Sequence, residues 1–175
     1  MRNTTLDELN LTREAQQILH SEIFGQACRQ THHLDTTVAM HSVGVARYAM
    51  KLCDLLERNG MKVDRDKVLI GSLCHDLGII GRDEKFGSSV QCCLGHPVDS
   101  VTVAKDILGD IDEKTAGIIR THMWPLAKEM PDSREALIVN VCDKHESVME
   151  TLELLGKKSR NAYDVVRHAM HGLNR

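Results

Sequence analysis

The stretch LIGSLCHDLGIIG, residues 69–81, decides the fold and directs attention to one chemistry. Its apolar residues recur at helical spacing, so we predict a helix that starts near Asp64 and stops at Gly78. The dipeptide His75-Asp76 falls near the C-terminal end of that helix. Alone the pair means little, because ten histidines and many aspartates in 175 residues make one such pair roughly expected by chance. Its meaning depends on what the rest of the chain offers.

Helical spacing of apolar residues continues through nearly every other segment, and sustained period-two alternation is missing. The pattern therefore predicts an all-α fold, a single-domain bundle of about six to seven helices over residues 1–175. The stretch over residues 81–94 is predicted to be a loop, with Pro97 near the first position of the next helix. The expected helices cover residues 11–28, 36–59, 64–78, 97–108, 112–123, 133–155 and 161–170.

Composition excludes several classes of protein. Apolar residues make up 42% and charged residues 27%, which argues against a disordered or fibrous chain. The net charge of -3 gives no support for specific nucleic-acid binding or for a membrane surface. No apolar stretch approaches the roughly 18 residues of a spanning helix and no secretory signal is visible, so we predict a cytoplasmic protein. The six cysteines are expected to be reduced thiols, and the ten histidines stand out as the candidate functional groups.

Nitrogen and oxygen ligands recur along the chain outside the His75-Asp76 pair. They are His41 in AMHSVGVARYA, His96 in LGHPVDSV, His122 in IRTHMWP and Asp143 in NVCDKHESV. A mixed imidazole and carboxylate set suits divalent Fe, Mn, Co, Ni or Zn, whereas an all-oxygen set would favour Mg or Ca. Because no cysteine shares these spacings, an open hydrolytic site is favoured over a thiolate-rich structural zinc site.

The order of these motifs resembles that of the HD-domain metal-dependent phosphohydrolase superfamily. The resemblance extends from about His41 to Asp143, and it places the core of the domain at about residues 34–155, with the terminal helices completing the bundle. It implies that His41, His75, Asp76 and Asp143 hold a first metal ion.

The same resemblance implies a second ion. His96 and His122 match the two further histidines of the bimetallic branch, in which the aspartate of the HD pair bridges both ions. Asp76 and His75 are therefore the expected catalytic pair. Two divalent transition-metal ions about 3.5–4 Å apart would activate a water molecule for attack on phosphorus. Iron or manganese is favoured, with Zn, Co, Ni or Mg as alternatives.

The sequence also departs from its bimetallic relatives. Many of them carry HDxGK, whose lysine lies near the substrate phosphate, but Ile79 stands at that position here. The GYP signature is absent, so cleavage of a cyclic dinucleotide has no specific support. The phosphate would then be met by basic residues elsewhere, and the candidates are Arg47, Arg82, Lys85 and Lys144.

The resemblance implies hydrolysis of a phosphoester or phosphoanhydride in a nucleotide or another small phosphorylated metabolite. Two alternatives stay open at this point. One is a di-iron oxygenase of the same fold that acts on a small organic molecule, since the ligand types alone do not separate the two chemistries. The other is a non-catalytic nucleotide-binding sensor domain. The sequence does not distinguish a monomer from a homodimer.

Overall fold

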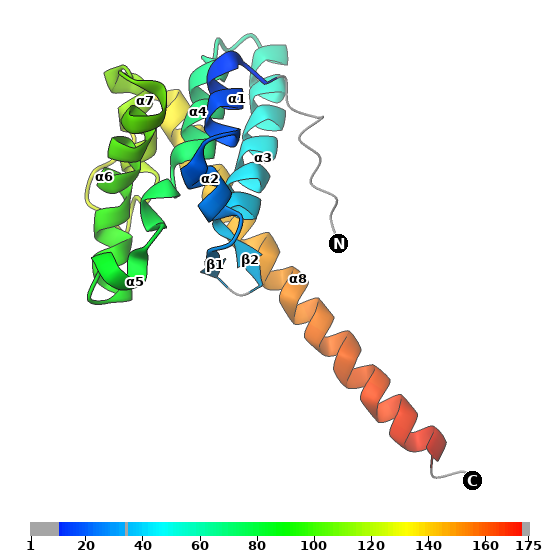
Figure 1. Ribbon diagram of the computed structural model, residues 1–175. Coiled ribbons are helices and arrows are strands. Elements are labelled where there is room, and N and C mark those ends of the chain that lie inside the picture. The colour runs from blue at the N-terminus through cyan, green and yellow to red at the C-terminus, as the bar shows by residue number, and fades with distance from the viewer. Residues whose placement is uncertain (1–10, 34, 173–175) are drawn as a thin grey trace.

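The computed structural model describes residues 11–33 and 35–172, with side chains over 11–32 and 35–157. Helices dominate, and the predicted all-α class is confirmed (Figure 1). A two-residue strand pairs antiparallel with a three-residue one to form a small ribbon. The elements are α1 (Arg13–Leu19), α2 (Glu22–Ala27), β1 (Thr31–His33), β2 (Thr36–Thr37), α3 (Val38–Arg58), α4 (Arg65–Cys74), the 3₁₀-helix η2 (Leu77–Ile79), α5 (Arg82–Lys85), α6 (Ser89–Leu108), α7 (Glu113–Thr121) and α8 (Arg134–Gly172).

The predicted loop over residues 81–94 is wrong. Most of it forms α5 and the first part of α6, and Pro97 lies inside α6 instead of in its first turn. The Ser88 hydroxyl explains the earlier start, because it accepts a hydrogen bond from the Gln91 backbone N–H at 3.2 Å and so caps the helix.

The first predicted helix, over residues 11–28, is divided in two. The side chain of Ser21 accepts a hydrogen bond from the backbone N–H of Phe24, which starts α2 separately from α1.

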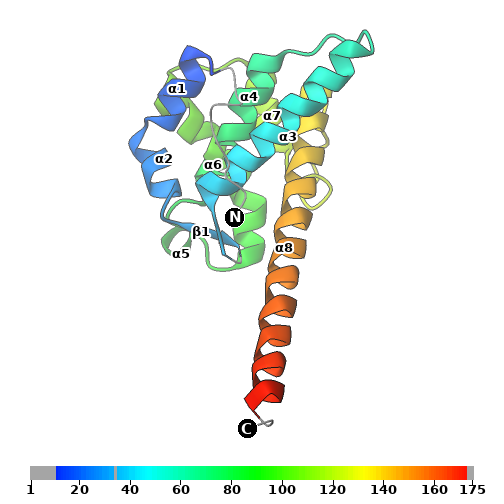
Figure 2. The same ribbon diagram turned by 90° about the vertical axis from the view of Figure 1, so that its right-hand side faces the viewer.

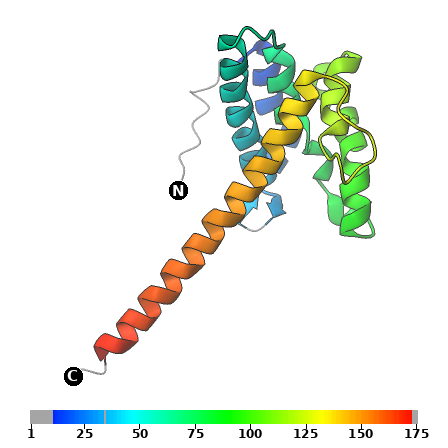
Figure 3. The same ribbon diagram turned by 180° about the vertical axis from the view of Figure 1, so that it is seen from behind.

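The break predicted between residues 155 and 161 is absent. Helix α8 runs for 39 residues, through Gly156. A single internal glycine costs a helix only about 1 kcal/mol, which is too little to end it without a capping group or a proline. The second half of α8 points away from the bundle in all three views (Figures 2 and 3). Within the described residues, no helix is long and apolar enough to cross a membrane.

Helix α4 lies at the centre of the bundle, in contact with α1, α3, α6, α7 and α8. Leu69 and Leu73 pack in one buried cluster with Ile18 of α1, and Val68 packs in a second with Val139 of α8. Because both sides of α4 are covered by neighbouring helices, the chain that leaves its C-terminal end stays inside the protein. The segment that follows this end of α4 is the turn formed by His75 and Asp76.

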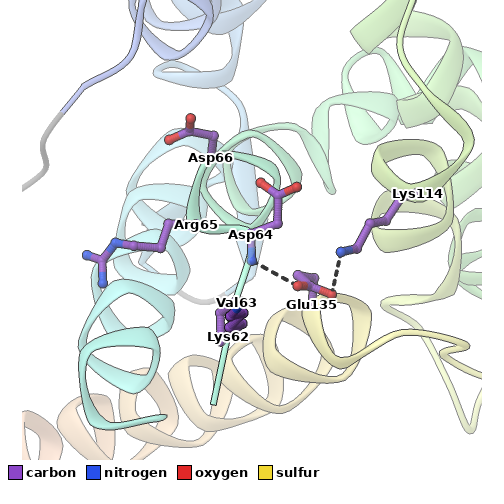
Figure 4. A pocket seen from close by; sticks show the side chains of 7 residues that line it. All are labelled: Lys62, Val63, Asp64, Arg65, Asp66, Lys114 and Glu135. Atoms are coloured by element: carbon purple, nitrogen blue, oxygen red, sulfur yellow. Dashed lines mark hydrogen bonds and ion pairs between the residues drawn. The ribbon is translucent and has the colours of Figure 1, made fainter. Parts of the chain in front are cut away.

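Glu135 connects three elements at the opposite end of α4 (Figure 4). Its carboxylate accepts a hydrogen bond from the Asp64 backbone N–H at 2.9 Å, and its other oxygen lies 2.9 Å from the Lys114 ammonium. Burial raises the pKa of Glu135, but these two partners outweigh it and lower the pKa below the ordinary value. The shallow pocket around it is therefore part of a structural junction between α4, α7 and α8.

We expect Glu135→Ala to reduce the free energy of unfolding at pH 7 by about 1–3 kcal/mol, because it leaves two partners without a buried acceptor. Glu113→Ala is the matched control, since Glu113 also lies in the first turn of a helix but its side chain is 83% exposed in its pair with Arg120. It should cost less than about 0.5 kcal/mol. Urea denaturation checks both values. Because the pKa of Glu135 is lowered, its contribution is present at neutral pH and is lost as the pH falls through that lowered value. Equal losses in both variants would contradict this role.

Candidate metal centre

The turn after α4 is held tightly against α6. His75 caps the C-terminal end of α4 and Asp76 precedes η2. A Cβ atom on Gly78 would lie 2.3 Å from the His96 carbonyl oxygen, and the Gly78 N–H donates to the Ser100 hydroxyl at 2.9 Å. Only glycine permits this approach of two backbones. The approach brings His96 of α6 beside the carboxylate of Asp76.

The two oxygens of Asp76 face different sets of imidazoles. Oδ1 lies 3.1 Å from His96 Nε2 and 3.4 Å from His122 Nε2. On the other side, Oδ2 lies 3.3 Å from His75 Nε2, 3.8 Å from His41 Nε2 and 3.0 Å from His32 Nε2. A single buried carboxylate thus stands between imidazoles from β1, α3, α6 and the C-terminal ends of α4 and α7.

Asp143 adds a second carboxylate to the set of imidazoles that faces Oδ2 of Asp76. Its Oδ1 lies 3.0 Å from His41 Nε2 and 3.9 Å from His75 Nε2. The other nitrogen of His41, Nδ1, faces the Glu150 carboxylate at 3.2 Å. A carboxylate behind a histidine fixes the orientation of the ring and makes its far nitrogen a better ligand.

Three of the rings present the same nitrogen to Asp76. In each, Nδ1 donates a hydrogen bond to a backbone carbonyl three or four residues earlier, at 2.8 Å in His75, 2.8 Å in His96 and 2.6 Å in His122. A neutral ring protonated at Nδ1 carries its lone pair on Nε2. All three lone pairs therefore point to the centre of the cluster.

This donor set fits cations. His75 Nε2 is buried and has no hydrogen-bond partner among the described residues, and the Nε2 atoms of His96 and His122 lie only 3.0 Å apart. Two facing lone pairs repel unless a proton or a metal ion lies between them. The ligand atoms of His41, His75 and Asp143 lie within 4.8 Å of one another, as do those of His75, Asp76 and His122. Imidazole nitrogen with carboxylate oxygen is the donor set of divalent transition metals.

The charges of the cluster also favour cations. Burial raises the pKa of Asp76 and of Asp143, but the neighbouring imidazoles outweigh it and lower both values, so both carboxylates are ionised. Burial lowers the pKa of His122, which keeps that ring neutral. Burial also lowers the pKa of His41, but the hydrogen bonds with Asp143 and Glu150 raise it to about 10. A cation that binds at His41 must therefore displace its proton.

A pocket of about 870 Å³ opens onto the cluster. Its lining includes Asp76, His96, Asp143 and His32 of the cluster, together with polar, charged and apolar side chains from the surrounding segments. This volume lies within the range of pockets for small molecules, about 300–1,000 Å³.

The HD domain family model matches residues 38–147. The chain belongs to the HD domain family. A curated relative, the dihydroneopterin 2′,3′-cyclic phosphate phosphodiesterase of Methanocaldococcus jannaschii, is 28% identical over 122 residues, which cover 66% of this chain and 48% of the relative. The chain thus spans about half the length of that relative. No solved structure shows significant similarity.

All six ligand positions expected from the resemblance meet at one place in this HD domain. His41, His75, Asp76, His96, His122 and Asp143 each have less than a tenth of their surface exposed. The four basic residues predicted to meet the phosphate differ in their position relative to the pocket. Arg82 and Lys144 line the pocket, and Lys144 Nζ lies 3.2 Å from Asp143 Oδ2. The structure does not bring Arg47 or Lys85 to it, because Arg47 lies over the Tyr48 ring and Lys85 lines a separate hollow beside α2.

Sequence reasoning missed three side chains of the HD centre. His32 lies in β1, ahead of the first motif of the resemblance, and the adjacent histidine at position 33 is the signal in the sequence that could have drawn attention to it. Glu150 lies seven residues, two helical turns, after Asp143 and so shares its face of α8; that spacing could have revealed it. Asn140 donates to the backbone carbonyls of His122 and Trp124 at 2.7 Å each, which holds the His122 turn against α8.

Proposed function

We propose that this chain is a metal-dependent phosphohydrolase that binds two divalent transition-metal ions, iron or manganese, on the two oxygens of Asp76. The observation that carries the proposal is the position of Asp76 between two sets of imidazole nitrogens, with one oxygen directed at each set. This is the arrangement expected of a bridging carboxylate. His41, His75 and Asp143 would hold one ion with Asp76, and His96 and His122 would hold the other.

Each protein group then has a defined part. Two divalent ions in such a site lower the pKa of a water molecule and neutralise charge on phosphoryl oxygens. Asp76, which lines the pocket, and His75 beside it would hold that chemistry next to the bound substrate. Glu150 holds the ring of His41 through Nδ1. The Lys144 ammonium donates to the His122 carbonyl at 2.6 Å and lies at the pocket wall, where it can meet a phosphate oxygen.

We propose a small cyclic or linear phosphoester as the substrate. The curated relative is named for a cyclic phosphate on a pterin, and the family match supports phosphoester hydrolysis in general. Phe86, Met123 and Leu126 contribute apolar side chains to the lining of the pocket, against which a heterocyclic ring can pack. A nucleotide offers the same combination of a flat ring and a phosphate.

The test is a substrate panel with the manganese- or iron-loaded protein. We expect 2′,3′-cyclic phosphates of nucleosides or pterins to be opened to a single phosphomonoester, with one solvent oxygen incorporated from ¹⁸O-labelled water. Activity with manganese in the absence of oxygen would separate the hydrolase from the di-iron oxygenase. Ligand binding without turnover of any phosphoester, with both ions bound, would instead support the sensor domain and contradict the proposal.

A further inference from the structure

His32 stands apart from the other histidines of the cluster. It belongs to β1, six residues before the region that the HD domain family model matches. Its Nε2 nevertheless lies 3.0 Å from Asp76 Oδ2, and its ring centroid lies 4.3 Å from that of His41. Its side chain is 14% exposed and lines the pocket. His32 thus reaches the centre from the two-stranded ribbon, whereas the other histidines of the cluster come from helices or helix ends.

The backbone around His32 is fixed to the segment that follows the HD pair. Arg82 Nη1 donates to the His32 carbonyl at 2.9 Å. Two residues earlier, the side chain of Gln30 donates to the Ile79 carbonyl at 3.3 Å and accepts from the Gly81 N–H at 3.0 Å. These bonds tie His32, and Gln30 just before β1, to η2 and to the start of α5. A side chain that only covered the site would not need such a fixed backbone.

The donor atoms around His32 form a group that can hold a metal ion. Those of His32, His41 and Asp76 all lie within 4.8 Å of one another. This group shares His41 with the group formed by His41, His75 and Asp143. We propose that His32 is a further protein ligand of the ion on the Oδ2 side of Asp76. The inference rests on the two-ion site proposed above.

A chemical consequence follows for the choice of metal. With His32 the Oδ2 side offers three imidazole nitrogens and two carboxylates, from Asp76 and Asp143. Nitrogen-rich sets favour iron, cobalt, nickel or zinc over magnesium, which prefers oxygen ligands. We therefore expect His32 to strengthen binding of transition metals much more than binding of magnesium.

The experiment compares the metal-free wild-type chain with His32→Ala and His32→Gln, each titrated with Co²⁺ against a competing chelator. His20→Ala is the matched control, because His20 is an exposed histidine on the same side of the family region. We expect both His32 variants to bind one of two Co²⁺ ions at least about tenfold more weakly, with the other ion and the control unchanged. X-ray absorption of the loaded proteins should show five imidazoles shared by two ions in the wild type and four in either variant.

Glutamine keeps a hydrogen-bond donor for Asp76 but is a poor ligand, so it separates two roles. Wild-type affinity in His32→Gln with loss only in His32→Ala would overturn the inference, because His32 would then act only by orienting Asp76. Wild-type affinity and imidazole number in both variants would overturn it as well. If the wild type itself does not bind two ions, that result contradicts the two-ion proposal, and with it the role of His32. Two ions in the wild type with no effect of either variant would remove only the role of His32.

Discussion

Replacing Asp76 with asparagine is expected to abolish phosphoester hydrolysis and to reduce the metal content of the chain. Asparagine keeps the shape of the side chain but removes the negative charge and one of the two oxygens. Both sets of imidazoles would then share a weak ligand instead of a carboxylate. We expect kcat/KM to fall at least about a thousandfold, equivalent to about 4 kcal/mol of transition-state stabilisation. Steady-state kinetics and elemental analysis of the same preparation check both parts.

Asp110→Asn is the matched control for this change, because Asp110 is an exposed aspartate that does not line the pocket. It should retain the activity and metal content of the wild type. Circular dichroism of Asp76→Asn must show the helical content of the wild type, so that the loss belongs to the site and not to folding. Retained hydrolysis in a folded Asp76→Asn variant would contradict a bridging role for this carboxylate.

Removal of the metal should lower thermal stability strongly. The six proposed ligands come from α3, the end of α4, α6, the end of α7 and α8, which are five separate elements. A cation that binds only the folded chain therefore adds directly to its free energy of unfolding. Free metal at about a thousand times the dissociation constant contributes about 4 kcal/mol. For a chain of this size that corresponds to a rise in Tm of about 8–16 °C. Calorimetry with chelator, and again after metal is restored, measures the shift.

The same stabilisation should depend on pH in a defined direction. The pKa of His41 is raised to about 10 in the metal-free protein, so its imidazole is protonated near neutral pH and must release that proton when it binds a cation. Metal affinity, and with it the rise in Tm, should therefore fall as the pH is lowered. The Asp76→Asn variant should show little of the metal-dependent rise in Tm. An identical Tm in the wild type with and without metal would contradict the account.

The burial of the expected ligands can be predicted from the sequence for a physical reason. His75 and Asp76 follow the apolar second half of α4, which is buried between neighbouring helices, so the end of the helix is buried too. His41 lies on a helix with an apolar face, and His122 caps the C-terminal end of α7. Both side chains are therefore expected to be buried for the same reason. The ligand roles themselves come from the resemblance to the HD-domain superfamily and stay a proposal. The meeting of these side chains around the two oxygens of Asp76 is a property of the packing, which the sequence does not display.

The parts that the sequence missed depend on contacts between segments far apart in the chain. His32 lies in a strand too short to show a period, and its position follows from the bonds of Gln30 and Arg82 to the turn after the HD pair. Arg47 and Lys85 were candidates for phosphate binding because of their charge, but charge alone does not say which side of a helix faces the pocket. The start of α6 differs from the prediction because Ser88 caps the helix ahead of Pro97, which the helix accommodates in its interior. The extent of the domain over residues 1–175 stays a prediction.

The most direct test of the central claim is a stoichiometric titration of metal-free protein with Mn²⁺, in which hydrolysis of a 2′,3′-cyclic phosphate is followed after each addition. The two-ion account predicts that activity rises until two ions are bound per chain and then stays constant, with little activity at one ion. Full activity at one ion per chain, or hydrolysis that persists in the metal-free protein, would contradict it.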